Sequence, residues 1–138
     1  METVKSYTDI SQAKVLAEIL PFESADMCYI KHSSSDNQNW EFNEDFPPMI
    51  LGSVPINEIT AETLPCWSLT ALINIIPQEI FDGEYIINIT EGRNNKWIIT
   101  YDHYEHRDHS YYGLSAGANN LVDACTDIII KLKERNII

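Results

Sequence analysis

Apolar residues recur with two different periods along the chain, and the change of period separates helical from extended segments. The helical period appears first over residues 9–21, where Asp9 and Gln12 have the spacing of a capping box and Pro21 ends the pattern. The stripe of this segment consists of Ile10, Ala13, Leu16, Ala17 and Leu20. The pattern predicts a short amphipathic helix.

Two further segments have the same helical period. In the first, residues 64–77, Pro65 or Ser68 begins a helix that Pro77 ends. Its apolar surface of Trp67, Leu69, Leu72, Ile73 and Ile76 predicts deep burial. In the second, residues 119–136, Asn119 or Asn120 caps a helix whose stripe is Leu121, Cys125, Ile128, Ile129 and Leu132. Lys131, Lys133 and Arg135 follow near its end, where the helix dipole favours positive charge.

Between these two helices the apolar period changes to two, which is typical of strands. Residues 84–91 and 96–104 are rich in β-branched and aromatic residues, and "GRNN" between them is a turn sequence. A third strand is expected over 110–118, where Gly113 and Gly117 predict a bulge or bend. Trp97, Ile99, Tyr101 and His103 share the face that we expect to point into the core.

The order of elements predicts an α+β fold. Weaker strand patterns at residues 25–32 and 49–53 precede the three-strand meander, and residues 33–47 are polar, which predicts a loop or a weak hairpin. Short turns join the strands of the meander, so the sheet should be mainly antiparallel and packed against about three helices. At 138 residues, the chain is expected to form a single domain, 1–138.

Composition and cysteine usage predict a cytoplasmic protein. The first twenty residues are interrupted by charges, which excludes the apolar core of a signal peptide, and the apolar runs are shorter than the roughly 20 residues that span a bilayer. Cys28, Cys66 and Cys125 are too few and too widely spaced for a paired disulfide framework or a metal knuckle. We expect three reduced, buried thiols and no membrane partner.

The formal net charge of -12 excludes several classes of function. Such a surface repels nucleic acids unless basic residues are segregated, and the sequence shows no basic patch. It also contains neither GxxxxGK nor GxGxxG, so we expect no nucleotide cofactor. Ser68 lacks the flanking glycines of a nucleophile elbow and is interpreted as a helix N-cap.

The segment "YDHYEHRDHSYY", residues 101–112, carries the residues most suggestive of chemistry. His103, His106 and His109 recur at every third position, and His103 and His109 can face each other across a hairpin. Together with neighbouring carboxylates they form a candidate metal site, and Asp102 or His103 is a candidate acid or base. The alternative is a hydrophilic hairpin tip whose polar residues only keep it hydrated.

A second candidate site is the loop that carries Trp40, Phe42 and Phe46 among acidic residues. Exposed aromatic residues anchor many protein interfaces, whereas the alternative is that these rings fold back over the core. Apart from the candidate acid or base at residues 102 and 103, the sequence offers no catalytic residue.

Three stretches together resemble a family of small uncharacterised proteins of Bacteroides-type bacteria and their phages or other mobile elements. These stretches are "SADMCY" (24–29), "LPCWSLTALINIIP" (64–77) and "NNLVDACTDIIIKLKE" (119–134). The resemblance implies a bacterial or phage cytoplasmic protein, and it brings no activity and no functional residues.

These observations lead to three functional hypotheses. The first is a small accessory protein that acts by contact with a partner protein, or as a homo-oligomer. The second is an acidic inhibitor or immunity-type protein that occupies the basic site of a nucleic-acid enzyme, since carboxylates can imitate phosphates. The third is a metal-binding protein or enzyme that uses the histidines of residues 103–109.

Overall fold

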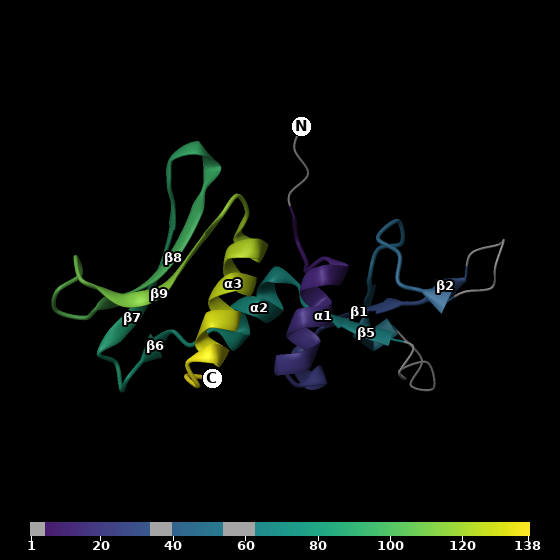
Figure 1. The fold of residues 1–138 in the computed structure, drawn as a ribbon, viewed down its shortest axis with the longest axis horizontal. Helices are drawn as coiled ribbons and strands as arrows, with labels where there is room; N and C mark the ends of the chain where they lie inside the picture. Colours follow the sequence, from purple (N-terminus) through teal and green to yellow (C-terminus); the bar gives the residue numbers. More distant parts are fainter. Residues whose placement is uncertain (1–4, 34–39, 54–62) are drawn as a thin grey trace. The chain divides into compact units, whose positions relative to one another are not determined.

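The computed structural model describes residues 5–33, 40–53 and 63–138 and confirms the α+β class. Three α-helices and mainly antiparallel strands lie in this described part of the chain (Figure 1). The chain divides into two compact units, residues 7–71 (unit 2) and residues 1–6 with 72–138 (unit 1), which we describe separately. The single-domain expectation stays a prediction. None of the helices in the described ranges has the length and apolar composition that a bilayer span requires.

Unit 2 consists of one helix and short antiparallel strands. The strand order is β4-β1-β5 in one sheet, and β2 pairs with β3 in a second. The elements are α1 (Ile10–Ile19), β1 (Met27–Ile30), β2 (His32–Ser33), β3 (Trp40–Glu41), β4 (Met49–Ile50) and β5 (Thr63–Cys66).

The predicted capping box begins α1. Asp9 accepts a hydrogen bond from the backbone N–H of Gln12 at 2.8 Å, and the Gln12 side chain accepts one from the Asp9 N–H at 3.0 Å. The buried face of the helix contributes Ile10 and Ala13 to a core shared with the strands of unit 2. That core also contains Tyr29, Leu64 and Cys66. The first helical prediction is therefore confirmed.

The second helix, α2 (Leu69–Ile75), begins after Ser68, so of the two predicted starts the one at Pro65 is wrong. Pro65 lies instead in β5, opposite Cys28 of β1, in a strand that the sequence did not predict. Among the described strands β5 is at the sheet edge, where a residue without an N–H is tolerated. Ser68 is the N-cap, because its Oγ accepts from the Ala71 N–H at 3.2 Å.

The burial of α2 is only partly as predicted. Leu72 and Ile76 are buried as expected, and Trp67 just before the helix is completely buried. Ile73 is 42% exposed, so the expectation of deep burial is wrong for this side chain. A seven-residue helix makes only two turns, and its apolar residues are too many to fit on one buried face.

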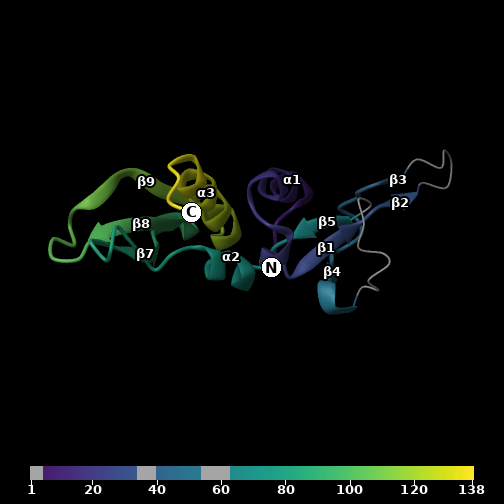
Figure 2. The same cartoon turned by 90° about the horizontal axis from the view of Figure 1, so that it is seen from below.

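Unit 1 is a four-stranded antiparallel sheet of order β6-β7-β8-β9 with α3 against it. Figures 1 and 2 show α3 on one side of the sheet, next to β8 and β9. The elements are β6 (Glu79–Ile80), β7 (Tyr85–Glu91), β8 (Trp97–His103), β9 (Ser110–Ala118) and α3 (Leu121–Glu134). The predicted meander is confirmed, and β6 is an additional strand.

The core of unit 1 joins the inner face of the sheet to α3. Ile99 and Tyr101 of β8 are fully buried, as the alternation predicts, and the Tyr101 hydroxyl donates to the Pro77 carbonyl at 2.6 Å. Asn120 caps α3 by accepting from the Asp123 N–H at 2.8 Å. The helix buries a stripe that comprises Val122, Ala124, Cys125, Thr126, Ile128, Ile129 and Leu132.

A bulge in β9 interrupts the pairing with β8 near Gly113, as the two glycines predicted. Thr100 pairs with Ser115 and Asp102 with Ser110, so the four residues 111–114 lie opposite Tyr101 alone. Gly113 has a φ of 75°, in the left-handed region that glycine adopts without strain. Extra residues in one strand bend it and redirect its side chains.

All three cysteines are free and buried, which confirms the sequence prediction. Burial raises the pKa of the Cys66 and Cys125 thiols to about 11, and it also raises the pKa of Cys28. Because the thiolate is the reactive form, burial leaves these side chains as core residues with little nucleophilic character at neutral pH.

Candidate functional site

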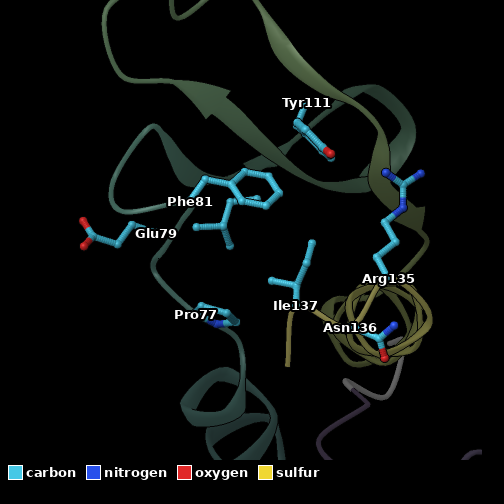
Figure 3. A pocket seen from close by; sticks show the side chains of 8 residues that line it. Pro77, Glu79, Phe81, Tyr111, Arg135, Asn136 and Ile137 are labelled. Atoms are coloured by element: carbon cyan, nitrogen blue, oxygen red, sulfur yellow. The ribbon is translucent and has the colours of Figure 1, made fainter.

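A cavity of about 700 Å³ opens in unit 1 beside the turn that follows β6 (Figure 3). Two aromatic rings, apolar side chains, a guanidinium group and an amide border it, and the Glu79 carboxylate is directed away from it. The lining residues are Pro77, Glu79, Ile80, Phe81, Tyr111, Arg135, Asn136 and Ile137. A concave site with apolar walls and few polar groups is the usual form of a binding pocket.

The turn between β6 and β7 holds Phe81 at the rim of this cavity. Phe81, Asp82 and Gly83 have φ values of 54°, 55° and 88°, and the Glu84 N–H donates to the Phe81 carbonyl at 3.1 Å. A bulky residue rarely adopts the left-handed region, which costs about 1 to 3 kcal/mol. The Phe81 side chain is nevertheless 46% exposed, so its own burial contributes little to offset this cost. Strain of this kind is typical of functional sites.

The β9 bulge brings Tyr111 against Phe81 at the cavity. The Tyr111 ring lies 5.1 Å from those of both Phe81 and Tyr85, and Tyr85 in turn lies 5.5 Å from the ring of His103. Phe81, Tyr111, Tyr85 and His103 therefore form a continuous row of rings, which we call the aromatic row. Tyr112, the next residue in the bulge, points to solvent and is 93% exposed.

Arg135 borders the cavity from the end of α3. Its guanidinium carbon lies 5.7 Å from the centre of the Tyr111 ring, and its Nη1 donates to the Tyr112 carbonyl at 3.1 Å. A Cβ on Gly113 would clash with Nη2 of Arg135, so the glycine makes room for the guanidinium group. Arg135 extends from the end of α3, and residues of the β9 bulge contact its guanidinium group.

The chain reversal after α3 supplies Ile137 to the cavity. Asn136 has a φ of 57°, its N–H donates to the Lys133 carbonyl, and the Ile137 N–H donates to the Leu132 carbonyl. These two bonds are those of a Schellman motif, which satisfies free carbonyls and turns the chain back toward the helix. Figure 3 shows Ile137 and Pro77 along the same side of the cavity, below Phe81.

A second hollow, of about 580 Å³, shares Pro77 with the first. It lies before the start of β6, beside the part of β7 that extends past it, since β6 pairs only with Tyr85 and Ile86. Its lining is mostly isoleucine: Ile73, Ile76, Ile86, Ile87 and Ile89, with Asn74, Pro77 and Gln78. The exposed side chain of Ile73 is therefore part of an apolar surface next to the cavity.

The three histidines meet, but as stacked rings. The His106 ring lies 5.3 Å from that of His103 and 5.8 Å from that of His109, and His103 also stacks on Tyr104 at 5.0 Å. As predicted, the hairpin pairs His103 with His109, through a backbone hydrogen bond of 2.9 Å. The Nδ1 of His103 accepts the N–H groups of Glu105 and His106, both at 3.2 Å. The histidine stack therefore extends the aromatic row to the hairpin tip.

The metal hypothesis for His103, His106 and His109 gains no support from this geometry. Over the described parts of the chain, no group of three or more His, Cys, Asp or Glu side chains is arranged to hold a metal ion. A zinc site needs ligand nitrogens that converge at about 2.0 to 2.1 Å from one point. The hypothesis stays a prediction, and metal binding would require the stack to rearrange.

A zinc titration tests this hypothesis. Binding through His103 Nδ1 would break two backbone hydrogen bonds, and binding through the other nitrogens would separate the rings, so we expect the ring resonances to remain unchanged at one equivalent of zinc. NMR spectra of the imidazole protons provide the measurement. A saturable shift of all three histidines at one equivalent would instead establish the metal site.

The aromatic residues of the early loop do not all follow the same alternative. One ring folds back over the core, as one alternative predicted, and another is exposed, as the other predicted. Phe42 packs against the core of unit 2, and the Lys31 ammonium lies 5.4 Å from its ring centre. Glu44 accepts from the Ile10 N–H at 3.2 Å, which ties the loop to the start of α1. Phe46 is 46% exposed, whereas the side chain of Trp40 lies outside what the structure describes.

The sequence did not identify the residues of the cavity. One signal was available: "FDGEY" contains Asp82-Gly83 between apolar residues, which is a strong hairpin sequence. It could have located β6 and the turn at Phe81. The position of Arg135 depends on the size of the β9 bulge and on the reversal after α3, which no local pattern gives.

Searches of protein-family models, curated proteins and solved structures find no match to this chain. The functional argument therefore depends on the geometry of the site alone.

Proposed function

We propose that this chain is a small accessory protein that acts by binding a partner protein through the cavity and the aromatic row of unit 1. The observation that carries the proposal is the strained turn that keeps Phe81 exposed at the cavity rim. The cytoplasmic, bacterial or phage setting implied by the family resemblance is part of this proposal.

The composition of the surface supports a protein partner. Aromatic side chains and arginine are the residues most enriched at the energetic centres of protein interfaces. Here Phe81, Tyr111 and Arg135 lie around one concavity, with the isoleucine-lined hollow adjacent to it. Apolar surface that is left exposed on a soluble domain commonly marks a contact site.

Substitution of Phe81 by asparagine tests the proposal. Asparagine tolerates the left-handed region, so the turn should persist while the ring is lost. The wild-type chain should recover a cross-linked partner from the source cell. With F81N, we expect the amount of recovered partner to fall at least tenfold. Mass spectrometry of the cross-linked complexes, quantified against the wild type, gives the measurement.

Tyr112→Ser is the matched control for this experiment. Tyr112 is a neighbouring aromatic residue that is almost fully exposed and does not line the cavity. Y112S should therefore retain the partner, and circular dichroism should show that both variants are folded. Equal recovery with F81N and the wild type would contradict the proposal. A partner that proves to be a second copy of the chain would identify the homo-oligomer.

A difference in charge between the units favours one second candidate function. Residues 7–71 contain ten acidic and two basic residues, whereas the remainder of the chain contains eleven and seven. A strongly acidic unit 2 is the composition expected for an inhibitor of a nucleic-acid enzyme. Partner capture that depends strongly on salt and survives F81N would favour this candidate.

A further inference from the structure

Arg135 has surroundings that are unusual for a cation in an acidic chain. The chain carries a formal charge of -12, yet no carboxylate in the described part of the chain forms an ion pair with this guanidinium group. A guanidinium group has five N–H donors. Among the described residues only the Tyr112 carbonyl accepts a hydrogen bond from Arg135.

The local contacts hold this cation in one place. The ring of Tyr111 lies under it, Gly113 makes room for Nη2, and the Tyr112 carbonyl fixes Nη1. These contacts restrict the rotamers of the exposed side chain, so less freedom is lost when an anion binds. Glu79 does not neutralise it, because Figure 3 shows Glu79 on the far side of the cavity and directed away from it.

We propose that the cavity binds the carboxyl terminus of a partner protein whose last residue is aromatic or large and aliphatic. The terminal carboxylate pairs with Arg135, and the last side chain packs against Phe81 and Tyr111, above Pro77 and Ile137. This inference rests on the proposed function, and it names the part of the partner that the cavity receives.

A carboxylate fits this site better than a phosphate. Planar carboxylates match the two parallel N–H groups of one guanidinium, whereas a dianionic phosphate is usually held by several cations or backbone amides. Among the residues that the structure describes, Arg135 is the only cationic one that lines the cavity. The surrounding negative charge of the chain further disfavours a dianion.

Two matched peptides test the inference. The first, Gly-Gly-Ser-Phe, has a free terminal carboxylate, and the second has the same sequence with a terminal amide. We expect the acid to bind the wild-type chain roughly tenfold more tightly than the amide, because a charge-assisted pair is lost in the amide. The shifts of the Phe81, Tyr111 and Arg135 resonances in NMR titrations measure both affinities.

Arg135→Gln should abolish the difference between the two peptides while leaving the amide affinity within about twofold of the wild-type value. Equal binding of acid and amide to the wild type, or binding of neither, would overturn the inference. So would 3-phenylpropionate that binds as tightly as the acid peptide, because a small acid would then suffice. If partner capture is lost in F81N but kept in R135Q, the proposed function stands and this inference fails.

Discussion

Asp102→Ala should lower the free energy of unfolding by about 2 to 4 kcal/mol, because it removes a buried carboxylate on which three side chains depend. Asp102 is only 5% exposed in β8. Its Oδ1 accepts hydrogen bonds from Thr100 and Ser110 at 2.8 Å each, and its Oδ2 accepts one from Asn88 at 2.9 Å. Urea unfolding followed by circular dichroism gives the measurement.

The same carboxylate should make stability depend on pH in the acid range. Burial by itself raises the pKa of Asp102, but the hydrogen bonds from Ser110, Thr100 and Asn88, with the charge of Arg107, lower it below its usual range. A lowered pKa in the folded state stabilises the protein above the ordinary aspartate value of about 3.9. This contribution is lost as the pH falls through the folded-state pKa.

Asp102→Asn is the matched control. The amide keeps the shape of the side chain, and rotation of the hydroxyl groups preserves part of the network, so the loss should be about 1 kcal/mol. The part of the acid dependence that belongs to Asp102 should disappear in D102N. A D102A variant within about 0.5 kcal/mol of the wild type would show that the network contributes nothing to stability.

The predictions that succeeded were those that depend on local sequence. Asp9 and Asn120 cap their helices because a side chain three residues from a free N–H can reach it in any protein. The strand alternation placed Ile99 and Tyr101 in the core for the same reason, since the period of two fixes which side chains share a face.

The features that were missed depend on residues far apart in the sequence. Asp102 lies on the polar side of the β8 alternation, and its burial follows from donors on β7 and β9 as well as on its own strand. Arg135 was interpreted as a charge that complements the helix dipole. Its place at the cavity requires the bulge at residues 111–114, whose position Gly113 indicated but whose size it did not.

The histidines also show that sequence can predict which residues meet but not how their side chains are oriented. Their spacing and the hairpin were correctly predicted to bring His103 and His109 together. The sequence could not give the ring orientations, because these depend on the position of Tyr85 in a neighbouring strand and on the backbone amides that bond to His103. The chemistry of the segment follows from orientation, and orientation is a tertiary property.

Trp67→Ala should be the most destabilising change in unit 2, with an expected loss of about 3 to 5 kcal/mol. The side chain is completely buried, and its indole N–H donates to the Ser24 hydroxyl at 2.9 Å. Its backbone N–H and carbonyl also bond to Thr8, at 3.2 Å and 3.0 Å. The truncation would leave a large void and remove the bond to Ser24, whose hydroxyl still donates to the Pro21 carbonyl, whereas the backbone bonds can persist.

Trp67→Phe separates the two contributions. Phenylalanine fills most of the volume but cannot donate to Ser24, so W67F should lose about 1 to 2 kcal/mol. Ser24→Ala should then cost no more than about 1 kcal/mol, because the Ser24 hydroxyl is near the surface. If W67A loses less than about 1.5 kcal/mol, the indole is not the structural centre that its burial indicates.

Native-state hydrogen exchange of W67A also tests whether the chain is a single cooperative domain. Amides of α1 report on unit 2, and amides of α3 report on unit 1. If the chain unfolds as one domain, the substitution removes the same free energy of protection from the slowest amides of both helices, because they exchange only through global unfolding. We expect this shared loss from the single-domain prediction. A loss confined to α1 would show instead that the two units unfold independently.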